Sequence, residues 1–153
     1  MATAMRPITV SALISVDPDE LFEFVSDTRK DPLWCPNVET VDQLAGEGVE
    51  VGARFRFHQH LDRPRQERMQ FDVDLEVIDL EEHSITWKAR DRFQERIISL
   101  TVEPHQTGSK ITQVTTATFL RPPGLARWVY PTLARRIFRD QFERLARHFA
   151  DEP

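Results

Sequence analysis

The C-terminal stretch from residue 122 to 149 constrains this chain most, because it predicts one long helix with an extended apolar side. Its apolar residues recur at steps of three and four, the spacing that places side chains on one side of an α-helix. They are Leu125, Trp128, Val129, Leu133, Ile137, Phe138, Phe142, Leu145, Ala146 and Phe149. A helix side of this length needs a partner surface, and only the alternating segments before it are large enough. The sequence therefore predicts a sheet wrapped around its last helix.

The opposite side of the predicted helix is basic. Six arginines and two acidic residues lie between residues 122 and 149, so this segment is positive within a chain whose net charge is -5. The default interpretation is a solvated face, and the alternatives are contact with anionic lipid head groups or with an acidic protein partner. Peripheral contact with a membrane is not the favoured interpretation.

Composition narrows the class of protein. A chain of 153 residues fits one domain, expected to span residues 1–153, and a domain near this size buries roughly 70% of its unfolded surface. No apolar run approaches the ~20 residues that cross a bilayer, and residues 1–6 lack the apolar core of a signal peptide, so we expect a soluble cytoplasmic protein. Cys35 is the only cysteine, which excludes an internal disulfide and a cysteine-cluster metal site. The net negative charge argues against nucleic acid as a partner, and the oligomeric state stays open.

The chain opens with a strand followed by helical turns. Residues 6–16 alternate so that one face is clearly apolar. Asp17 is a good N-cap, Pro18 suits the first helical position and Glu20 supplies the acid of a capping box, so a helix is expected directly after this strand. Residues 32–36 then form a compact apolar turn between two prolines, which we expect to close one end of the fold.

Residues 38–120 show the two-residue period of strands joined by turns. The clearest run covers residues 69–77, where apolar side chains face one way and acidic ones the other. The inward set Ile98, Leu100 and Val102 places Arg96 on the same face of its strand. Residues 111–120 have two similar faces, and we favour the even-numbered set as inward.

The order of elements resembles a known fold. The segments that carry the resemblance are Ser15-Val16-Asp17-Pro18, Leu21-Phe22-Glu23-Phe24-Val25, Pro32-Leu33-Trp34-Cys35-Pro36, Val51-Gly52-Ala53-Arg54-Phe55 and the closing amphipathic helix. Together they are similar to the START-related helix-grip superfamily, specifically its polyketide cyclase/dehydrase and lipid-transport branch. The resemblance implies an α+β fold in which a curved antiparallel sheet of about seven strands wraps around the C-terminal helix, with two short helices after the first strand. It also implies an apolar cavity, whereas the chemistry is not fixed by such a fold.

Eleven residues are the candidates for lining that cavity, chosen by inward parity or by position on the last helix. They are Trp34, Phe55, Phe57, Phe71, Trp87, Arg96, Ile98, Thr116, Thr118, Trp128 and Leu133. The aromatic members could form a cage for a planar ligand. Ordinary core packing predicts the same inward aromatic side chains, so the sequence does not separate a pocket from a filled core.

Arg96 is the most informative candidate, because an inward guanidinium must be paired or must bind a ligand carboxylate, phosphate or enolate. Two alternatives stay open. A strand bulge could turn Arg96 outward, or it could pair with Glu95 or Asp91 of the same region.

Two other polar clusters have simpler interpretations. His58 and His60 share a strand face and could ligate a metal ion with a third residue, but Phe55 and Phe57 take the inward face of that strand, so solvent exposure is favoured. The acidic residues at 72, 74 and 76 are expected to face solvent opposite Arg54 and Arg56. No metal and no cofactor is expected, since no phosphate-binding, dinucleotide or hydrolase motif is found.

Three hypotheses about function follow. The first is binding of a small hydrophobic or amphipathic ligand, lipid-like or polyketide-like, between the sheet and the last helix. The second is a polyketide cyclase or dehydratase that stabilises an enolate through Arg96, and an inward histidine or carboxylate near Arg96 would favour it over the first. The third is a protein-interaction module that uses the basic helix, for which a packed interior and an exposed apolar patch would be the signs. No catalytic residue is assigned from the sequence.

Overall fold

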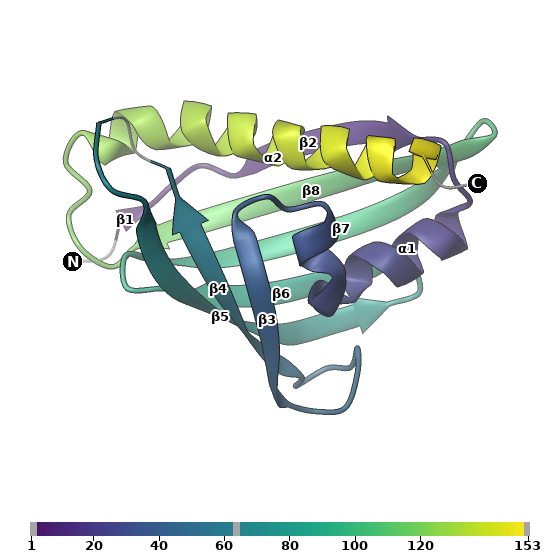
Figure 1. Ribbon diagram of the computed structural model, residues 1–153, viewed down its shortest axis with the longest axis horizontal. Coiled ribbons are helices and arrows are strands. Elements are labelled where there is room, and N and C mark those ends of the chain that lie inside the picture. The colour runs from purple at the N-terminus through teal and green to yellow at the C-terminus, as the bar shows by residue number, and fades with distance from the viewer. Residues whose placement is uncertain (1–2, 63–64, 152–153) are drawn as a thin grey trace.

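The computed structural model describes residues 3–62 and 65–151 (Figure 1). The strands and helices follow in the order β1 (Thr3–Ala4), β2 (Ile8–Ile14), α1 (Pro18–Ser26), the 3-10 helix η1 (Thr28–Leu33), β3 (Val38–Ala45), β4 (Arg54–Leu61), β5 (Met69–Glu81), β6 (Ser84–Arg90), β7 (Gln94–His105), β8 (Gly108–Phe119) and α2 (Ala126–Asp151).

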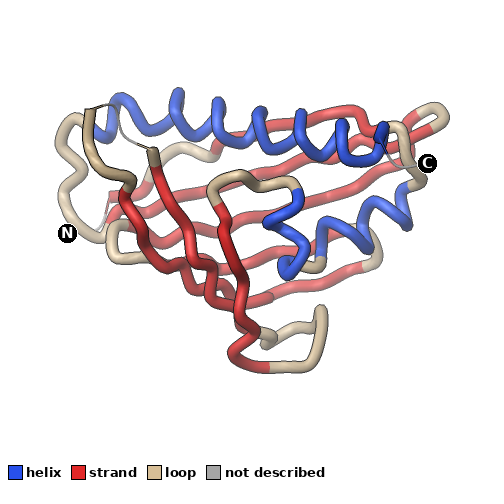
Figure 2. Tube along the Cα trace, viewed as in Figure 1, coloured by secondary structure: helices blue, strands red, loops and turns tan. Residues whose placement is uncertain are grey.

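All the strands of the described residues form one antiparallel sheet in the order β1-β8-β7-β6-β5-β4-β3, and β2 also pairs with β8. The first long strand, β2, therefore lies beside the last one, β8. From β3 to β8, neighbours in the sheet are also consecutive in the chain, as antiparallel strands joined by short connections are. Figure 1 shows α2 running along β2 and β8, and Figure 2 shows the curved strands with α1 and η1 near one end. Apart from the two-residue β1, the sheet has the seven strands expected, so the predicted helix-grip fold is confirmed.

Local hydrogen bonds determine the path of the segment between β2 and β3. The Asp17 carboxylate accepts a hydrogen bond from the Asp19 N–H at 3.0 Å, which starts α1 as predicted. The Asp31 carbonyl then accepts from the N–H groups of Trp34 and Cys35, at 3.1 and 2.7 Å. This closes η1 and turns both side chains into the interior, where Trp34 is 4% exposed.

Helix α2 begins later than predicted. Pro122 and Pro123 lack backbone N–H donors and Gly124 has φ +57°, so the first regular turn starts at Ala126. The buried residues of α2 are Ala134, Phe138, Phe142 and Leu145.

The first turns of α2 do not bury their apolar side chains as expected. Trp128 is 77% exposed and Val129 is 59% exposed. Tyr130 lies one helical turn before the buried Ala134 and on the same side of the helix. Trp128 and Val129 therefore lie on another side. The prediction of one continuous buried side is therefore right for the later turns and wrong for the first ones.

The predicted parity of β8 is also wrong. The odd-numbered residues Ile111, Gln113, Thr115, Ala117 and Phe119 are buried, whereas Thr116 and Thr118 lie on the outer face. The register fixes this choice, because β8 residues directly opposite the inward set of β7 share its face: Val102 faces Ile111 and Leu100 faces Gln113. The buried amide of Gln113 is accommodated because its Nε2 donates to the Thr115 hydroxyl at 3.1 Å.

Gly108, at the hairpin between β7 and β8, is expected to tolerate no side chain. An added Cβ would lie 2.5 Å from the carbonyl oxygen of Ile14 and 3.2 Å from the Cα of Ser15, both backbone atoms of β2 and its end. We therefore expect Gly108→Ala to lower the free energy of unfolding by about 2 kcal/mol or more, measured by urea denaturation. Gly48→Ala is the matched control, because nothing lies within 4 Å of its added Cβ. Equal stability of the two variants would contradict the prediction.

Candidate functional site

Two adjoining cavities lie between the sheet and α2. The first, called the inner cavity, has a volume of about 80 Å³ and includes Thr28, Asp31, Trp34 and Trp87 in its wall. The second, called the outer cavity, has a volume of about 230 Å³ and includes residues nearer the surface. The residues common to both walls are Val38, Gln59, Arg96, Phe138 and Gln141. The interior therefore contains two adjoining cavities, and Arg96 belongs to the wall of both.

Seven of the eleven candidate residues lie in these walls. Trp34, Phe57, Trp87, Arg96 and Ile98 line the inner cavity, and Phe71, Leu133 and again Arg96 line the outer one. Phe55 is 1% exposed and belongs to the packed core. Thr116 and Thr118 point to the other face of the sheet, and Trp128 lies outside, beside a groove formed with residues 4–8. For these four residues the predicted position in the cavity wall is not found.

Polar side chains that the sequence did not single out complete the walls. They are Thr28, Asp31, Asn37, Gln59, Gln94, Gln113, Tyr130 and Gln141. Gln59 could have been found, since it shares the inward parity of Phe57. Tyr130 could have been found by stepping back one helical turn from Ala134. For Asp31 no pattern in the sequence indicated an inward carboxyl.

Arg96 reaches the cavities because its strand neighbours are small. It is directly opposite Ala89 on β6 and Ala117 on β8, both buried. The pairing of β7 with both neighbours is regular, so the alternative of a bulge does not hold. Its Nε is buried and has no hydrogen-bond partner.

The proposed internal partners of Arg96 are engaged elsewhere. Glu95 lies 3.7 Å from the Lys88 ammonium group. Asp91 uses Oδ1 to accept hydrogen bonds from the N–H groups of Phe93 and Gln94, at 2.7 and 2.9 Å. A guanidinium with a buried, unpaired N–H at a cavity wall is the arrangement expected of an anion or enolate contact.

Tyr130 places a phenol in the wall of the outer cavity, which also contains Arg96. Burial raises the pKa of its phenol, the positive charge of Arg96 opposes this rise, and the charge of Asp91 adds to it. The phenol is therefore protonated at neutral pH and available as a hydrogen-bond donor beside Arg96. Phe119 packs edge-on against the Tyr130 ring, with 5.3 Å between ring centroids, which limits its rotation.

Asp31 is a buried carboxyl in the wall of the inner cavity. Burial raises its pKa well above the usual range, the negative charge of Asp27 raises it further, and the nearby Trp34 indole lowers it in part. Burial therefore favours the protonated form of this carboxyl. Burial, together with Asp31, also raises the pKa of the Cys35 thiol, so this cysteine is a weak nucleophile.

The histidines considered as metal ligands belong to the outer face of the sheet. His58 lies between two carboxylates, with Nδ1 2.8 Å from Asp72 and Nε2 2.8 Å from Asp42. Its hydrogen bonds to Asp42 and Asp72 raise its pKa. Arg56 pairs with Asp74 across β4 and β5 at 2.8 Å. The Arg56–Asp74 pair is the cross-strand surface pair predicted. His60 is less exposed than predicted, since its side chain is 13% exposed and its Nδ1 lies 3.0 Å from Glu39.

A curved antiparallel sheet around a C-terminal helix, with cavities between the two, defines the helix-grip class of proteins. Residues 5–150 match the family model described as polyketide cyclase / dehydrase and lipid transport, and the chain belongs to that family. No curated protein matches the chain. Within the described residues, no helix is long and apolar enough to span a membrane.

Solved structures share the fold at low sequence identity. A protein of Thermus thermophilus is 14% identical with a TM-score of 0.74, over 96% of this chain and 100% of that one. The major latex-like protein 151 of Panax ginseng is 17% identical with a TM-score of 0.72, over 95% and 97% of the two chains. The KanY protein is 22% identical with a TM-score of 0.69, over 94% and 97%. Identities in this range support the fold alone.

Proposed function

We propose that the protein binds a small amphipathic molecule, with an apolar body in the outer cavity and an anionic or enolate-like head at Arg96. The observation that carries this proposal is the buried Arg96 Nε without a partner at the boundary of the two cavities. The family to which the chain belongs, described by polyketide cyclase/dehydrase and lipid transport, is consistent with such a ligand.

Apolar burial would supply most of the affinity. Phe71, Leu133 and Ile137 line the outer cavity, and removing apolar surface from water stabilises a complex by about 25 cal/mol per Å². Arg96 and Tyr130 would set the orientation, since a charge-assisted hydrogen bond in a dry site is stronger and more directional than a neutral one.

Loss of the Arg96 charge is expected to weaken binding of an anionic apolar probe. Anilinonaphthalene sulfonate carries an apolar ring system and one sulfonate, and its fluorescence rises in apolar surroundings. We expect Arg96→Met to weaken its affinity by about tenfold or more, since hydrogen bonds to charged groups contribute about 1.5–3 kcal/mol. Fluorescence titration of both proteins measures this.

Arg54→Met is the matched control, because Arg54 begins β4 and is exposed on the outer face. It should bind the probe as the wild type does. Equal weakening in both variants would show that the probe responds to surface charge, and would contradict the proposal. Native mass spectrometry of the purified protein adds an independent test, since a small-molecule adduct should be lost on denaturation.

A cyclase or dehydratase is the second candidate, and one observation favours it. Asp31 and Tyr130 are inward acids in the walls that also contain Arg96, which meets part of the condition stated for catalysis. Their raised pKa values make them proton donors. Forming an enolate also needs a base, and the further carboxylate of the outer wall, Asp91, already accepts hydrogen bonds from the N–H groups of Phe93 and Gln94. Ligand binding is therefore the preferred function. If the wild type removes water from a synthetic poly-β-keto thioester and Arg96→Met does not, catalysis becomes the preferred function instead.

The interaction-module hypothesis has one of its two signs. The first turns of α2 expose Leu125, Trp128 and Val129, but the interior contains cavities instead of being fully packed. A ligand-binding role therefore accounts for more of the structure than a docking role does.

A further inference from the structure

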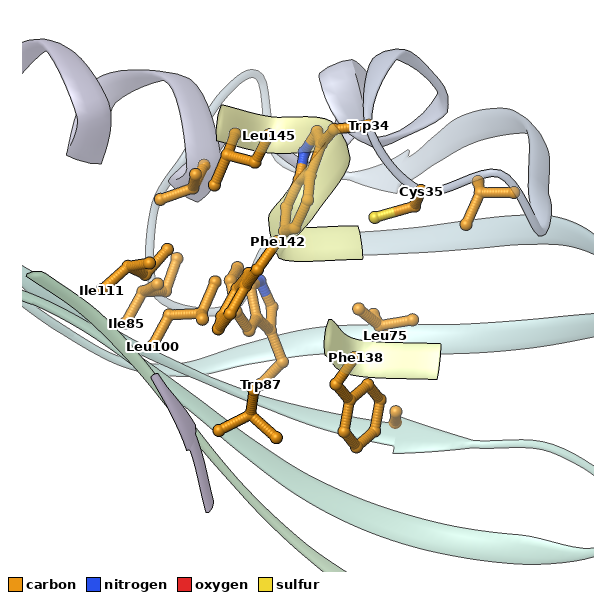
Figure 3. Close-up of a cluster of buried hydrophobic side chains, with 14 of the residues drawn as sticks. Trp34, Cys35, Leu75, Ile85, Trp87, Leu100, Ile111, Phe138, Phe142 and Leu145 are labelled. Atoms are coloured by element: carbon orange, nitrogen blue, oxygen red, sulfur yellow. The ribbon is translucent and has the colours of Figure 1, made fainter. Parts of the chain in front are cut away.

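Besides Arg96 Nε, four buried polar atoms of residues that line the inner cavity have no hydrogen-bond partner. They are Thr28 Oγ1, Asp31 Oδ1, Trp34 Nε1 and Trp87 Nε1. Three come from residues 28–34, and Trp87 comes from β6 on the sheet. Figure 3 shows Trp34 above and Trp87 below, with Phe142 between them. More than about 90% of buried polar groups in proteins are hydrogen-bonded, so four exceptions around one cavity indicate a partner that is not part of the chain.

The chemistry of these atoms specifies what that partner must be. The two indole nitrogens can only donate, so the partner must carry an oxygen or another acceptor; the Trp34 indole also lies near the Asp31 carboxyl, whose pKa it lowers. Burial favours the protonated form of that carboxyl, which can donate from one oxygen and accept with the other. The Thr28 hydroxyl can do either. A hydroxyl (one donor, two acceptor sites) or a carbonyl (two acceptor sites) can pair with two or three members of this set, whereas an aliphatic end leaves all four atoms unpaired.

Charge argues against an ion at this position. Asp27 raises the pKa of Asp31 even though it pairs with Arg29, so an anion is disfavoured beside residues 27–31 and is better placed at Arg96 on the boundary. A cation would meet two indole N–H groups, which present their positive edge, and the guanidinium of Arg96, which belongs to the same wall. An uncharged oxygen group avoids both penalties.

The size of the inner cavity sets a further limit. About 80 Å³ accommodates a small functional group, and the adjoining outer cavity of about 230 Å³ is the larger space. Arg96 lies at the boundary, so one molecule could contact the guanidinium and extend past it to residues 28–34.

We propose that the inner cavity is a subsite for an uncharged oxygen group, a hydroxyl or a carbonyl, that pairs with two or three of the polar atoms of Thr28, Asp31, Trp34 and Trp87. The proposal rests on the proposed function, because the rest of the same ligand lies at Arg96 and in the outer cavity. The ligand class is then an apolar molecule with two polar positions, an acidic one and a neutral one. A simple fatty acid lacks the second.

The test compares straight-chain alkanoates from hexanoate to dodecanoate with their 2-, 3- and 4-hydroxy and amino counterparts, by isothermal titration calorimetry, because a substituent near the carboxylate can enter the inner cavity while the chain stays in the outer one. At the substituent position that reaches the inner cavity, the wild type should bind the hydroxy acid about tenfold more tightly than the parent acid, the gain expected of satisfied buried hydrogen bonds. In Asp31→Leu and in Thr28→Val this gain should fall below about twofold. Thr116→Val, on the outer face of β8, is the matched control and should keep the full gain.

The variants also separate this proposal from the proposed function. Asp31→Asn retains a donor and an acceptor and should keep the gain, and circular dichroism establishes that each variant is folded. If Asp31→Leu does not fold, Thr28→Val decides. Alkanoate binding that depends on Arg96 but gains nothing from a hydroxyl at any of these positions would overturn the subsite alone. Tighter binding of the amino-substituted acid than of the hydroxy acid would do the same. If no alkanoate binds the wild type, the proposed function fails and the subsite falls with it.

Discussion

Replacing Phe142 by alanine is expected to lower the free energy of unfolding by about 3–5 kcal/mol, the usual cost of removing a buried phenylalanine. Phe142 is 2% exposed and lies on the side of α2 that faces the sheet. Its ring stacks on that of Trp34, with 6.3 Å between centroids and 14° between planes. The substitution removes this contact and leaves a cavity between α2, η1 and the sheet (Figure 3). Urea denaturation followed by circular dichroism measures the change.

Val129→Ala is the matched control on the same helix, since Val129 is 59% exposed. Alanine also favours the helix more than valine does, so this variant should stay within about 0.5 kcal/mol of the wild type. A loss below about 1 kcal/mol for Phe142→Ala would mean that the last helix contributes little to the stability of the sheet. The helix-grip arrangement predicts the opposite.

The fold was predictable because several independent patterns agree on it. Alternation along β5 puts Val73, Leu75 and Val77 inside, and all three are buried. The cap at Asp17 starts α1 where the strand ends. Phe138 and Phe142 lie on the expected side of α2. Local preference and burial favour the same structure at each of these positions, as in a sequence whose interactions are mutually consistent.

The errors arose where a pattern had two solutions. Both faces of β8 carry threonine and apolar residues, so its composition does not decide the parity. The register with β7 decides it, and counting from the pair His105 and Gly108 at the hairpin would have given the odd set. Trp128 was placed inside because it is apolar and near the correct spacing, yet the inward stripe passes through Tyr130 instead.

The candidate site was predictable only in part. Arg96 follows from strand parity, since it alternates with Ile98 and Leu100. Asp31 does not, because its burial depends on the path of η1 and on the cover that Trp34 and Phe142 provide. An acidic residue in a polar run is usually exposed, and only the three-dimensional structure places this one in a cavity wall.

Asp31→Asn is expected to stabilise the protein near neutral pH by about 1 kcal/mol or more, because it removes a carboxyl that the folded state holds protonated. The unfolded chain releases this proton above a pKa of about 3.9, whereas the folded state retains it because burial raises the pKa of Asp31. As pH rises above that value, the unfolded state gains stability relative to the folded one. The wild type therefore loses stability with increasing pH, by about 1.4 kcal/mol per pH unit for one proton, until the pH reaches the folded-state pKa.

The variant cannot titrate at this position, so its advantage should be absent at low pH, grow as the pH rises above about 4, and level off above the folded-state pKa. Urea denaturation of both proteins between pH 3 and pH 8 measures the difference. Asp79→Asn, at an exposed position of β5, is the matched control and should change stability by no more than about 0.5 kcal/mol. A constant difference between Asp31→Asn and the wild type across the range would mean that the pKa of Asp31 is the same in the folded and unfolded states, so that the folded protein holds an ionised carboxylate near neutral pH. A ligand group in the inner cavity would then have to neutralise that charge, and the subsite would select an amine instead of a neutral oxygen group.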